Sequence, residues 1–387
     1  PRVKILHTSD WHIGKRLMGR ERLSEQAAAL DEIVEICEAE GVELVLVAGD
    51  VFDTYLPGAE AEELFFSEIR KMAGEKRAVL LISGNHDDGV RLSASAPLSE
   101  ELGIYIVGNS RKPLPLHSSR PVRPVSSGAG WAVFENERGE RAFVNTLPYP
   151  NEARFKEEKS DLPFAERMKK WIDEGEAGNA EHLPSVFLSH IFVAGGVTSE
   201  SEREIDLGGA RAVPPDVLPP SDYIALGHLH KRQHMGRGNC WYSGSLLRYS
   251  FDEAGGEKGV KVFDLTERGV ENLHDVFLKS GKQLVRLEAD SPAAAEELLD
   301  RWQDAYAELK LHLASPLTSA ESASLAAHPN LVSLIAEVSA SESLAFESRK
   351  GLSDAELFSE FYRSQYGGEP PEELKTLFLS VLRETEG

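Results

Sequence analysis

The first third of the chain alternates short apolar runs with stretches of helical hydrophobic spacing. Residues 3–6, 44–47 and 79–82 are rich in branched apolar side chains, as buried strands are. Between these runs, residues 24–39 and 59–72 place apolar side chains three and four positions apart, on one face of a helix. Strands joined by helices predict a parallel α/β sheet with helical crossovers.

Further along, the pattern becomes richer in strands. Apolar runs follow one another through loops that contain proline and glycine, as they do in hairpins. The expected strands are residues 104–107, 131–134, 142–147, 186–188, 223–226, 240–242, 259–264 and 271–278. Because parallel and hairpin patterns occur in one chain, we expect an α/β fold in which two mixed β-sheets face each other and helices flank them.

The last third predicts a small α+β unit and a helical tail. A strand over 283–288, a long helical pattern over 293–313 and an apolar run over 330–338 make up the unit. Two amphipathic helices, over 354–366 and 372–382, follow on either side of a Gly-Gly-Glu-Pro-Pro stretch. The expected domain bounds are 1–278, 279–345 and 346–387.

The composition is that of a globular protein. Of 387 residues, 41% are hydrophobic, so a disordered chain is not expected. With 42 basic and 64 acidic residues the net charge is −22, which argues against a uniformly basic nucleic-acid binder. Two cysteines cannot form a disulfide framework and indicate a reducing compartment. Because no apolar run reaches the ~20 residues of a membrane helix and the first residues have a strand pattern, we expect a cytoplasmic protein without membrane contact.

Five short motifs carry the candidate chemistry, and each directly follows a predicted strand. They are Asp10-Trp-His12, Gly49-Asp50, Gly84-Asn-His-Asp87, Ser189-His190 and Gly227-His-Leu-His230. The carboxyl ends of strands in an open α/β sheet lie at the edge that binds ligands. Taken singly, each motif is typical of a turn or of a packed histidine. Five in succession after strands favour a shared site instead.

The side chains of these motifs are metal ligands by type. Two carboxylates, four imidazoles and one amide oxygen can converge: Asp10, Asp50, His12, His190, His228, His230 and Asn85. Oxygen and imidazole ligands without thiolate favour Mn²⁺, Fe or Zn²⁺. These ligands exceed the number that one catalytic ion takes, and they suit two ions that share a carboxylate.

The motif series DxH…GD…GNHD…SH…GHxH resembles that of the calcineurin-like metallophosphoesterases. The neighbouring residues 7–14, 48–54 and 227–230 are similar to those of SbcD-type nuclease subunits. The resemblance implies a metallophosphoesterase domain, then a capping and DNA-binding domain, then C-terminal helices that dock on a partner. It also implies a Mn²⁺-dependent exonuclease and endonuclease, which acts with a coiled-coil SbcC-type ATPase on double-stranded DNA ends and hairpins in repair and recombination.

The resemblance further implies a role for each motif residue. One ion would be held by Asp10, His12, Asp50 and His230, and the other by Asp50, Asn85, His190 and His228. Both are expected to be Mn²⁺, with Mg²⁺, Fe or Zn²⁺ as alternatives. His86 would be a catalytic residue that contacts the scissile phosphate, and Asp87 would orient its imidazole. Asp53 stands where archaeal relatives carry a second histidine.

Several other side chains have two interpretations each. Residues 64–69 either form the face of a homodimer or pack on the sheet. The apolar residues of the C-terminal helices either dock on the ATPase or fold back on the chain. Trp11 is expected to pack beneath the site, whereas Tyr149 either lines the cleft or is structural. Basic residues near the motifs either contact DNA phosphates or are solvated charge: Lys15, Arg16, Arg20, Arg111, Lys112, Lys231 and Arg232.

The same ligands would also serve two other functions. A stand-alone phosphatase or cyclic-nucleotide phosphodiesterase uses such a site, although the ~110 residues after the core exceed what it needs. A noncatalytic scaffold would be expected to lose ligands, whereas every motif is intact here.

Overall fold

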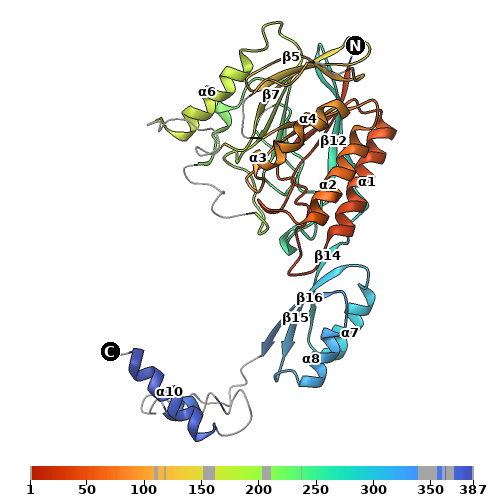
Figure 1. Cartoon of the computed structure of the whole chain (residues 1–387). Coiled ribbons are helices and arrows are strands. Elements are labelled where there is room, and N and C mark those ends of the chain that lie inside the picture. The colour runs from red at the N-terminus through yellow and green to blue at the C-terminus, as the bar shows by residue number, and fades with distance from the viewer. Residues whose placement is uncertain are drawn as a thin grey trace. The chain divides into compact units, whose positions relative to one another are not determined.

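The structure is a computed structural model, and it describes residues 2–108, 112–116, 119–150, 162–202, 211–236, 238–338, 355–359, 362 and 370–385. The chain divides into two compact units (Figure 1). One contains Pro1–Leu311 and Leu317–Ala336, and the other contains His312–Pro316 and Glu337–Gly387.

The first sheet has six strands, in the order β13-β12-β1-β2-β3-β4. Its parallel strands are β1 (Val3–Thr8), β2 (Leu44–Ala48), β3 (Ala78–Ile82) and β4 (Ile104–Val107). Antiparallel strands β12 (Gly259–Thr266) and β13 (Gly269–Phe277) extend it beyond β1. Helices α1 (Leu23–Glu40) and α2 (Ala59–Ala73) connect β1 to β2 and β2 to β3, so the predicted crossover pattern is confirmed. The short helices α3 (Gly89–Leu92) and α4 (Ala96–Ser99) precede β4.

The second sheet is mixed and has seven strands, in the order β10-β11-β9-β8-β7-β6-β5. They are β5 (Arg123–Gly128), β6 (Trp131–Glu135), β7 (Arg141–Leu147), β8 (Ser185–His190), β9 (Tyr223–Gly227), β10 (Gln233–His234) and β11 (Cys240–Tyr242). Helix α6 (Phe164–Glu176) packs against this sheet. The sequence pattern does not predict β5, because Pro124 and a register shift before Ser126 interrupt its alternation.

Alternating side chains of the two sheets form the core. Ile5 of β1 and Leu188 of β8 belong to a buried cluster between the sheets. On the outer face of the first sheet, Val45 shares a cluster with residues of α1 and α2, which lie side by side (Figure 1). On the outer face of the second sheet, Phe187 shares a cluster with Ile172 of α6. Each such burial contributes ~1.5–3 kcal/mol. The predicted fold class, two facing mixed sheets flanked by helices, is confirmed.

After β13 comes a small α+β segment around a three-stranded sheet, in the order β14-β15-β16. Its elements are β14 (Leu284–Ala289), α7 (Pro292–Arg301), β15 (Tyr306–Leu313), α8 (Ser319–Ala326) and β16 (Leu331–Val338). The prediction of one long helix over 293–313 is therefore wrong. The helix ends at Arg301, and β15 then buries Ala307, Leu309 and Leu311 at every second position, which is strand periodicity.

The second unit contains the C-terminal helices. Helix α10 (Glu372–Thr385) begins where the sequence predicts it. Of the helix expected over 354–366, residues 355–359 are helical, and most of the remainder lies outside the described residues. Phe358 stacks on Phe378 with ring centroids 4.2 Å apart, so the two segments pack on each other. Across the described part of the chain, no helix combines the length and apolarity needed to span a bilayer.

Candidate metal centre

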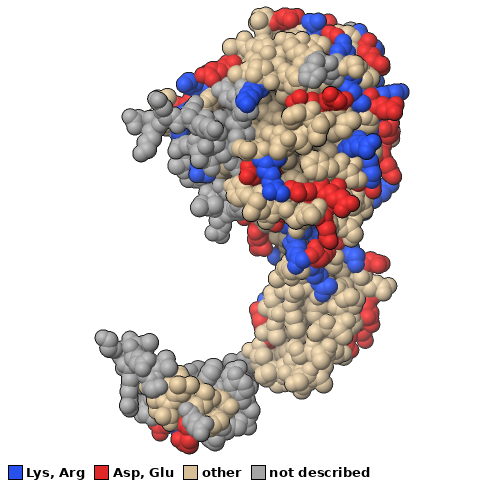
Figure 2. Space-filling view, viewed as in Figure 1, with Lys and Arg blue, Asp and Glu red and all other residues tan. Residues whose placement is uncertain are grey.

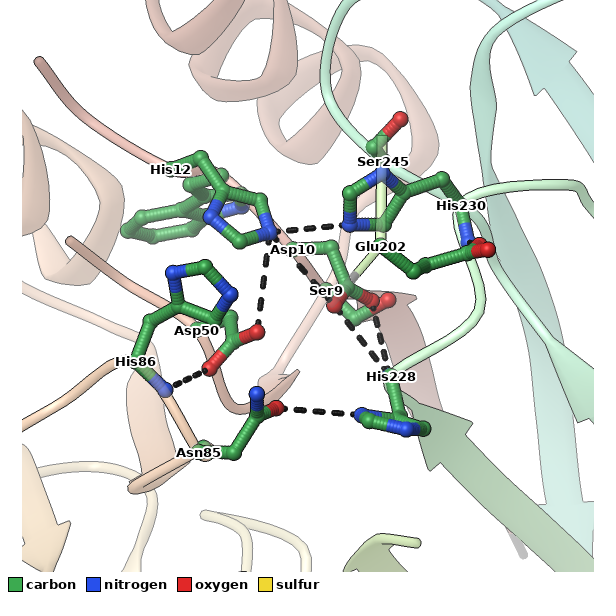
Figure 3. A network of polar contacts seen from close by, with 12 residues as sticks. Ser9, Asp10, His12, Asp50, Asn85, His86, Glu202, His228, His230 and Ser245 are labelled. Atoms are coloured by element: carbon green, nitrogen blue, oxygen red, sulfur yellow. Dashed lines mark hydrogen bonds and ion pairs between the residues drawn. The ribbon is translucent and has the colours of Figure 1, made fainter. Parts of the chain in front are cut away.

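The seven predicted ligands converge at one edge of the two sheets. Figure 3 labels all of them except His190. Loops after β1, β2 and β3 bring Asp10, His12, Asp50 and Asn85 from the first sheet. The end of β8 and the loop after β9 bring His190, His228 and His230 from the second sheet. All seven side chains are buried. The site therefore lies where the carboxyl ends of strands in both sheets face each other, as expected for α/β sheets.

The backbone at this edge is strained in a way that presets the ligands. Asp10, His12, Asp50 and His228 have φ between 46° and 110°, and they are four of the seven described non-glycine residues with positive φ. Such conformations cost ~1–3 kcal/mol each and persist where the surroundings fix them. Here the amide of Asp10 donates to the carbonyl of Gly49 and the amide of His12 donates to the carbonyl of Asp50, both at 3.0 Å.

Two glycines allow the loops to meet. A Cβ atom at Gly84 would lie 2.0 Å from Oδ1 of Asp50, and one at Gly227 would lie 1.8 Å from the carbonyl oxygen of Ala48. Both contacts are to fixed groups, so no larger residue fits at either position. Glycine at these two positions therefore allows the loops after β3 and β9 to lie against the end of β2 and the loop that follows it.

The first group of ligands consists of Asp10, His12 and His230. Nε2 of His12 lies 2.9 Å from Nε2 of His230 and 3.5 Å from Oδ2 of Asp50. Burial lowers the pKa of His12 to about 4 and that of His230 well below its usual value, so both rings are neutral. Two neutral imidazoles that face each other through Nε2 both offer a lone pair to a cation when each ring carries its proton on Nδ1.

The second group of ligands surrounds His190. Its Nδ1 donates to the carbonyl of Ala48 at 2.7 Å, the outer contact that metal-binding histidines commonly make. Its Nε2 lies 2.9 Å from Oδ1 of Asn85 and 3.4 Å from Oδ2 of Asp50. Nδ1 of His228 lies 3.0 Å from the same Asn85 oxygen.

The electrostatics of the site favour positive charge beside Asp50. Burial would raise the pKa of Asp50, but the charges of His190 and His86 outweigh it and hold that pKa well below its usual value. Burial alone would lower the pKa of His190, yet Asp50 raises it to about 9. Burial raises the pKa of Asp10 to about 7. Two buried carboxylates among oxygen and imidazole donors fit divalent cations by charge and by ligand type.

His86 and its neighbours differ in part from expectation. The amide of His86 donates to Oδ1 of Asp50 at 2.8 Å, and its Nδ1 donates to the carbonyl of Asp53 at 2.7 Å. Asp53 also lies 3.4 Å from Nδ1 of His12, so the residue at this position contacts both rings. Asp87 accepts amide hydrogen bonds from Val51, Phe52 and Gly84, which join the loops after β2 and β3. The expected role of Asp87 in orienting His86 stays a prediction.

Most of the basic residues singled out in the sequence have partners within the chain. Lys15 pairs with Asp53, Arg16 with Glu21, Lys231 with Asp252 and Arg232 with Asp275, and Arg20 donates to the carbonyl of Leu331. Figure 2 shows basic and acidic residues interspersed on the visible face. Lys112 is exposed, and Arg111 lies outside the described residues. These pairings favour a structural role for the half-buried members of the set, Lys15, Arg20, Lys231 and Arg232.

The two aromatic residues near the motifs have structural contacts. Trp11 is fully buried and donates its indole N–H to Thr8 at 3.0 Å, in agreement with the predicted role beneath the site. Tyr149 stacks on His228 with ring centroids 6.2 Å apart, and its hydroxyl accepts from Arg211 at 2.9 Å.

Residues 3–232 match the family model of the calcineurin-like phosphoesterases. The SbcD subunit of nuclease SbcCD from Bacillus subtilis (strain 168) is 37% identical over 98% of this chain and 97% of its own length. The chain belongs to the SbcD family of calcineurin-like phosphoesterases. The corresponding SbcCD nuclease subunit from Rhodobacter capsulatus is 36% identical over 77% of this chain and 74% of its own length. A dimetal phosphatase from Danio rerio, with TM-score 0.40 and 13% identity over 73% of this chain and 100% of that one, is too distant to add to the assignment.

Proposed function

We propose that this chain is a Mn²⁺-dependent DNA nuclease subunit that hydrolyses phosphodiester bonds at double-stranded ends and hairpins. The observation that carries the proposal is the convergence of seven buried oxygen and imidazole ligands from both sheets. The full-length similarity to an SbcCD nuclease subunit supports a DNA substrate rather than a small phosphoester. The same similarity supports a role beside an SbcC-type ATPase in repair and recombination.

Two ions are proposed, with Asp50 between them. Asp10, His12, Asp50 and His230 would hold one ion, and Asp50, Asn85, His190 and His228 the other. When bound, divalent ions supply Lewis acidity and neutralise the charge that develops on a phosphodiester during hydrolysis. The support is that Oδ2 of Asp50 lies within 3.5 Å of His12 and 3.4 Å of His190, one residue from each group.

His86 is proposed as the residue that acts on the substrate. Because its Nδ1 donates to the carbonyl of Asp53, Nε2 is the nitrogen that can contact a phosphate. A protonated ring would donate Nε2–H to the phosphate or pass that proton to the leaving oxygen. The ring also lies within ligand distance of His12 and Asp50, so metal binding must be measured alongside activity.

The proposal is tested by cleavage of labelled linear duplex and hairpin DNA with Mn²⁺, Mg²⁺ or a chelator. A generic aryl phosphate and a cyclic nucleotide are assayed in parallel. We expect Mn²⁺-dependent cleavage of DNA and little hydrolysis of the small substrates. Hydrolysis of the small substrates without DNA cleavage would support a phosphatase or phosphodiesterase instead, and inactivity on all of them would favour a scaffold.

Two apolar surfaces support the proposed partners. A groove between α2, α4 and β4 contains three exposed side chains, Phe66, Leu98 and Leu102, and is proposed as the homodimer face. On α10, Leu374 and Leu377 are exposed, and this helix is proposed to dock on the coiled coil of the ATPase. Exposed apolar residues that cluster in this way are typical of interaction sites. Among the basic residues, the exposed Arg16 and Lys112 are the proposed phosphate contacts, since an exposed ion pair exchanges readily.

A further inference from the structure

His190 and His230, which belong to different ligand groups, differ in the hydrogen-bond partner of the ring nitrogen that faces away from the site. The outer nitrogen of His190 meets a main-chain carbonyl, that of Ala48. The outer nitrogen of His230 meets a side chain instead, because its Nδ1 lies 2.5 Å from Oγ of Ser201. The hydroxyl of Ser201 in turn donates to Oε1 of Glu253 at 2.6 Å. Two consecutive hydrogen bonds therefore link His230 of the first group to Ser201 and Ser201 to Glu253.

The direction of the hydrogen bonds in this chain determines the tautomer of His230. The carboxylate of Glu253 only accepts, so it takes the single hydroxyl hydrogen of Ser201. The oxygen of Ser201 must then accept from His230, which requires the proton of the neutral ring to be on Nδ1. Nε2 is left with its lone pair, directed at Nε2 of His12 2.9 Å away. This is the protonation state in which His230 can bind a cation.

Buried acidic and basic side chains hold the main-chain amide and carbonyl of His230. Nζ of Lys258 donates to the carbonyl of His230 and to Oγ of Ser245, both at 2.8 Å, and pairs with Glu253. Oε1 of Glu202 accepts from the amide of His230 at 2.6 Å. Glu202, Glu253 and Lys258 are all less than 9% exposed. The main-chain amide, the carbonyl and the ring of His230 are therefore each hydrogen-bonded to a side chain.

A purely structural role does not account for this arrangement. Replacing buried ion pairs with apolar residues of similar volume is often neutral or stabilising, so folding alone does not require Glu253 and Lys258. An apolar cluster would not, however, fix the tautomer of His230. Carboxylate-linked partners of metal-binding histidines orient the ring and raise its basicity.

We propose that Ser201 and Glu253 are positioning residues that hold His230 as its Nδ1–H tautomer and strengthen binding of the divalent cation in the first ligand group. This inference rests on the proposed function, because it takes the two groups to be metal sites. It predicts an asymmetry between the sites, since His190 relies on a main-chain carbonyl that substitution of Ser201 leaves in place.

The test is a Mn²⁺ titration of the full chain, with free Mn²⁺ followed by electron paramagnetic resonance. We expect Ser201→Ala to weaken one of two Mn²⁺ sites by ~10–100-fold and to leave the other unchanged. Ser201→Thr, which keeps the hydroxyl, should restore the affinity. Ser99→Ala is the matched control, because Ser99 is a buried serine that donates to a carbonyl of α4, outside the metal ligands.

A second readout follows the tautomer without metal. In ¹⁵N-histidine spectra of the metal-free protein, His230 should carry its proton on Nδ1 in the wild type and Ser201→Thr, and on either nitrogen in Ser201→Ala. Glu253→Gln should weaken the same Mn²⁺ site. Its unfolding temperature without metal is measured too, because Lys258 then lacks its partner.

The outcomes separate the two proposals. Unchanged affinity at both sites in Ser201→Ala would overturn the inference, as would equal weakening of both sites together with a lower unfolding temperature of the metal-free protein. A Ser201→Thr variant as weak as Ser201→Ala would also overturn it. Wild-type protein that binds no Mn²⁺ would instead contradict the proposed function, and this inference with it.

Discussion

At the scale of the residue, the site is built from side chains whose backbone is held in uncommon conformations. Asp10, His12 and Asp50 each follow a strand and each have a φ near 50°. The strain is tolerated because amide hydrogen bonds join the loops after β1 and β2. The ligand atoms therefore need little rearrangement to meet a cation, and single substitutions among them should act on binding and catalysis more than on the fold.

Asp50→Asn should abolish cleavage. One carboxylate oxygen lies between His12 and His190, and a neutral amide bridges two dications poorly. The loss should exceed the ~10–100-fold that removal of an outer partner of a ligand costs. Mn²⁺ binding and DNA cleavage are measured together, with Asp300→Asn as a control because its carboxylate is 78% exposed. Full Mn²⁺-dependent activity in Asp50→Asn would refute the shared-ligand assignment.

His86→Ser should reduce DNA cleavage by ~10²–10⁴-fold while both Mn²⁺ sites keep their affinity. The reason is that Nε2 of His86 is proposed to act on the phosphate rather than on a metal. Single-turnover cleavage and Mn²⁺ titration are compared with those of His234→Ser, an exposed histidine on β10. If the His86 variant lost Mn²⁺, the residue would be a ligand and the catalytic role would be wrong.

At the scale of the element, Asp87 connects the ends of two strands. Its carboxylate accepts from three main-chain amides of the loops after β2 and β3, and it is fully buried. Burial, followed by the charge of Asp50, raises the pKa of Asp87 to about 6. Three hydrogen bonds to one carboxylate hold the loop of Asp50 against that of Asn85.

Asp87→Ala should lower the free energy of unfolding by ~3–5 kcal/mol, because three buried amides lose their acceptor. Asp88→Ala is the matched control. Asp88 caps the four-residue helix α3 by accepting from Val90 and Arg91, and loss of such a cap costs ~0.5–2 kcal/mol. Urea unfolding of the metal-free proteins measures both. Equal losses in the two variants would show that Asp87 does not hold the strand ends together.

The elements show what the sequence could predict and what it could not. Ligands that directly follow apolar strands are found from local pattern, because strand ends in such sheets share an edge. The prediction of one helix over 293–313 is wrong because no proline or glycine separates the helix-forming residues of α7 from the alternating residues of β15. Ser201, Glu202, Glu253 and Lys258 carry no local signal. Ser201, Glu202 and Lys258 contact His230 although they lie 28 to 29 residues from it in the sequence. Glu253 is linked to it through Ser201 and Lys258.

At the scale of the whole molecule, the larger unit carries the metal centre and the groove proposed for dimerisation, and the smaller unit carries α10. Basic and acidic residues are interspersed on the visible face (Figure 2), and exposed ones such as Lys71 and Arg91 pair with carboxylates of the same chain. The exposed apolar residues of the groove and of α10 are therefore the proposed interaction surfaces. If these surfaces act separately, dimerisation and ATPase docking should be lost through different substitutions.

Leu98→Asp should convert a homodimer into a monomer. Leu98 is 79% exposed in the groove beside α2, so a charge there is solvated in a monomer but is buried in a dimer. Leu116→Asp, at another exposed leucine outside the groove, is the control. Light scattering at micromolar concentration measures the mass. A wild type that is monomeric under these conditions would rule out the dimer, and a dimeric Leu98→Asp variant would place its interface elsewhere.

Leu377→Asp should weaken binding to the coiled coil of an SbcC-type ATPase and leave the nuclease active on its own. Leu377 is 60% exposed on α10, so the substitution does not disturb a buried core, whereas an amphipathic helix in a groove depends on such anchors. Thr376→Asp is the matched control, because Thr376 is the adjacent exposed residue and points to a different face of the helix.

Affinity for the purified ATPase is measured by pull-down and by titration. A loss of ~2 kcal/mol or more, the size of an anchor residue at an interface, is expected for Leu377→Asp alone. Because Leu98→Asp should leave this affinity unchanged, equal weakening by the Leu98 and Leu377 variants would show that docking requires the dimer rather than α10 alone.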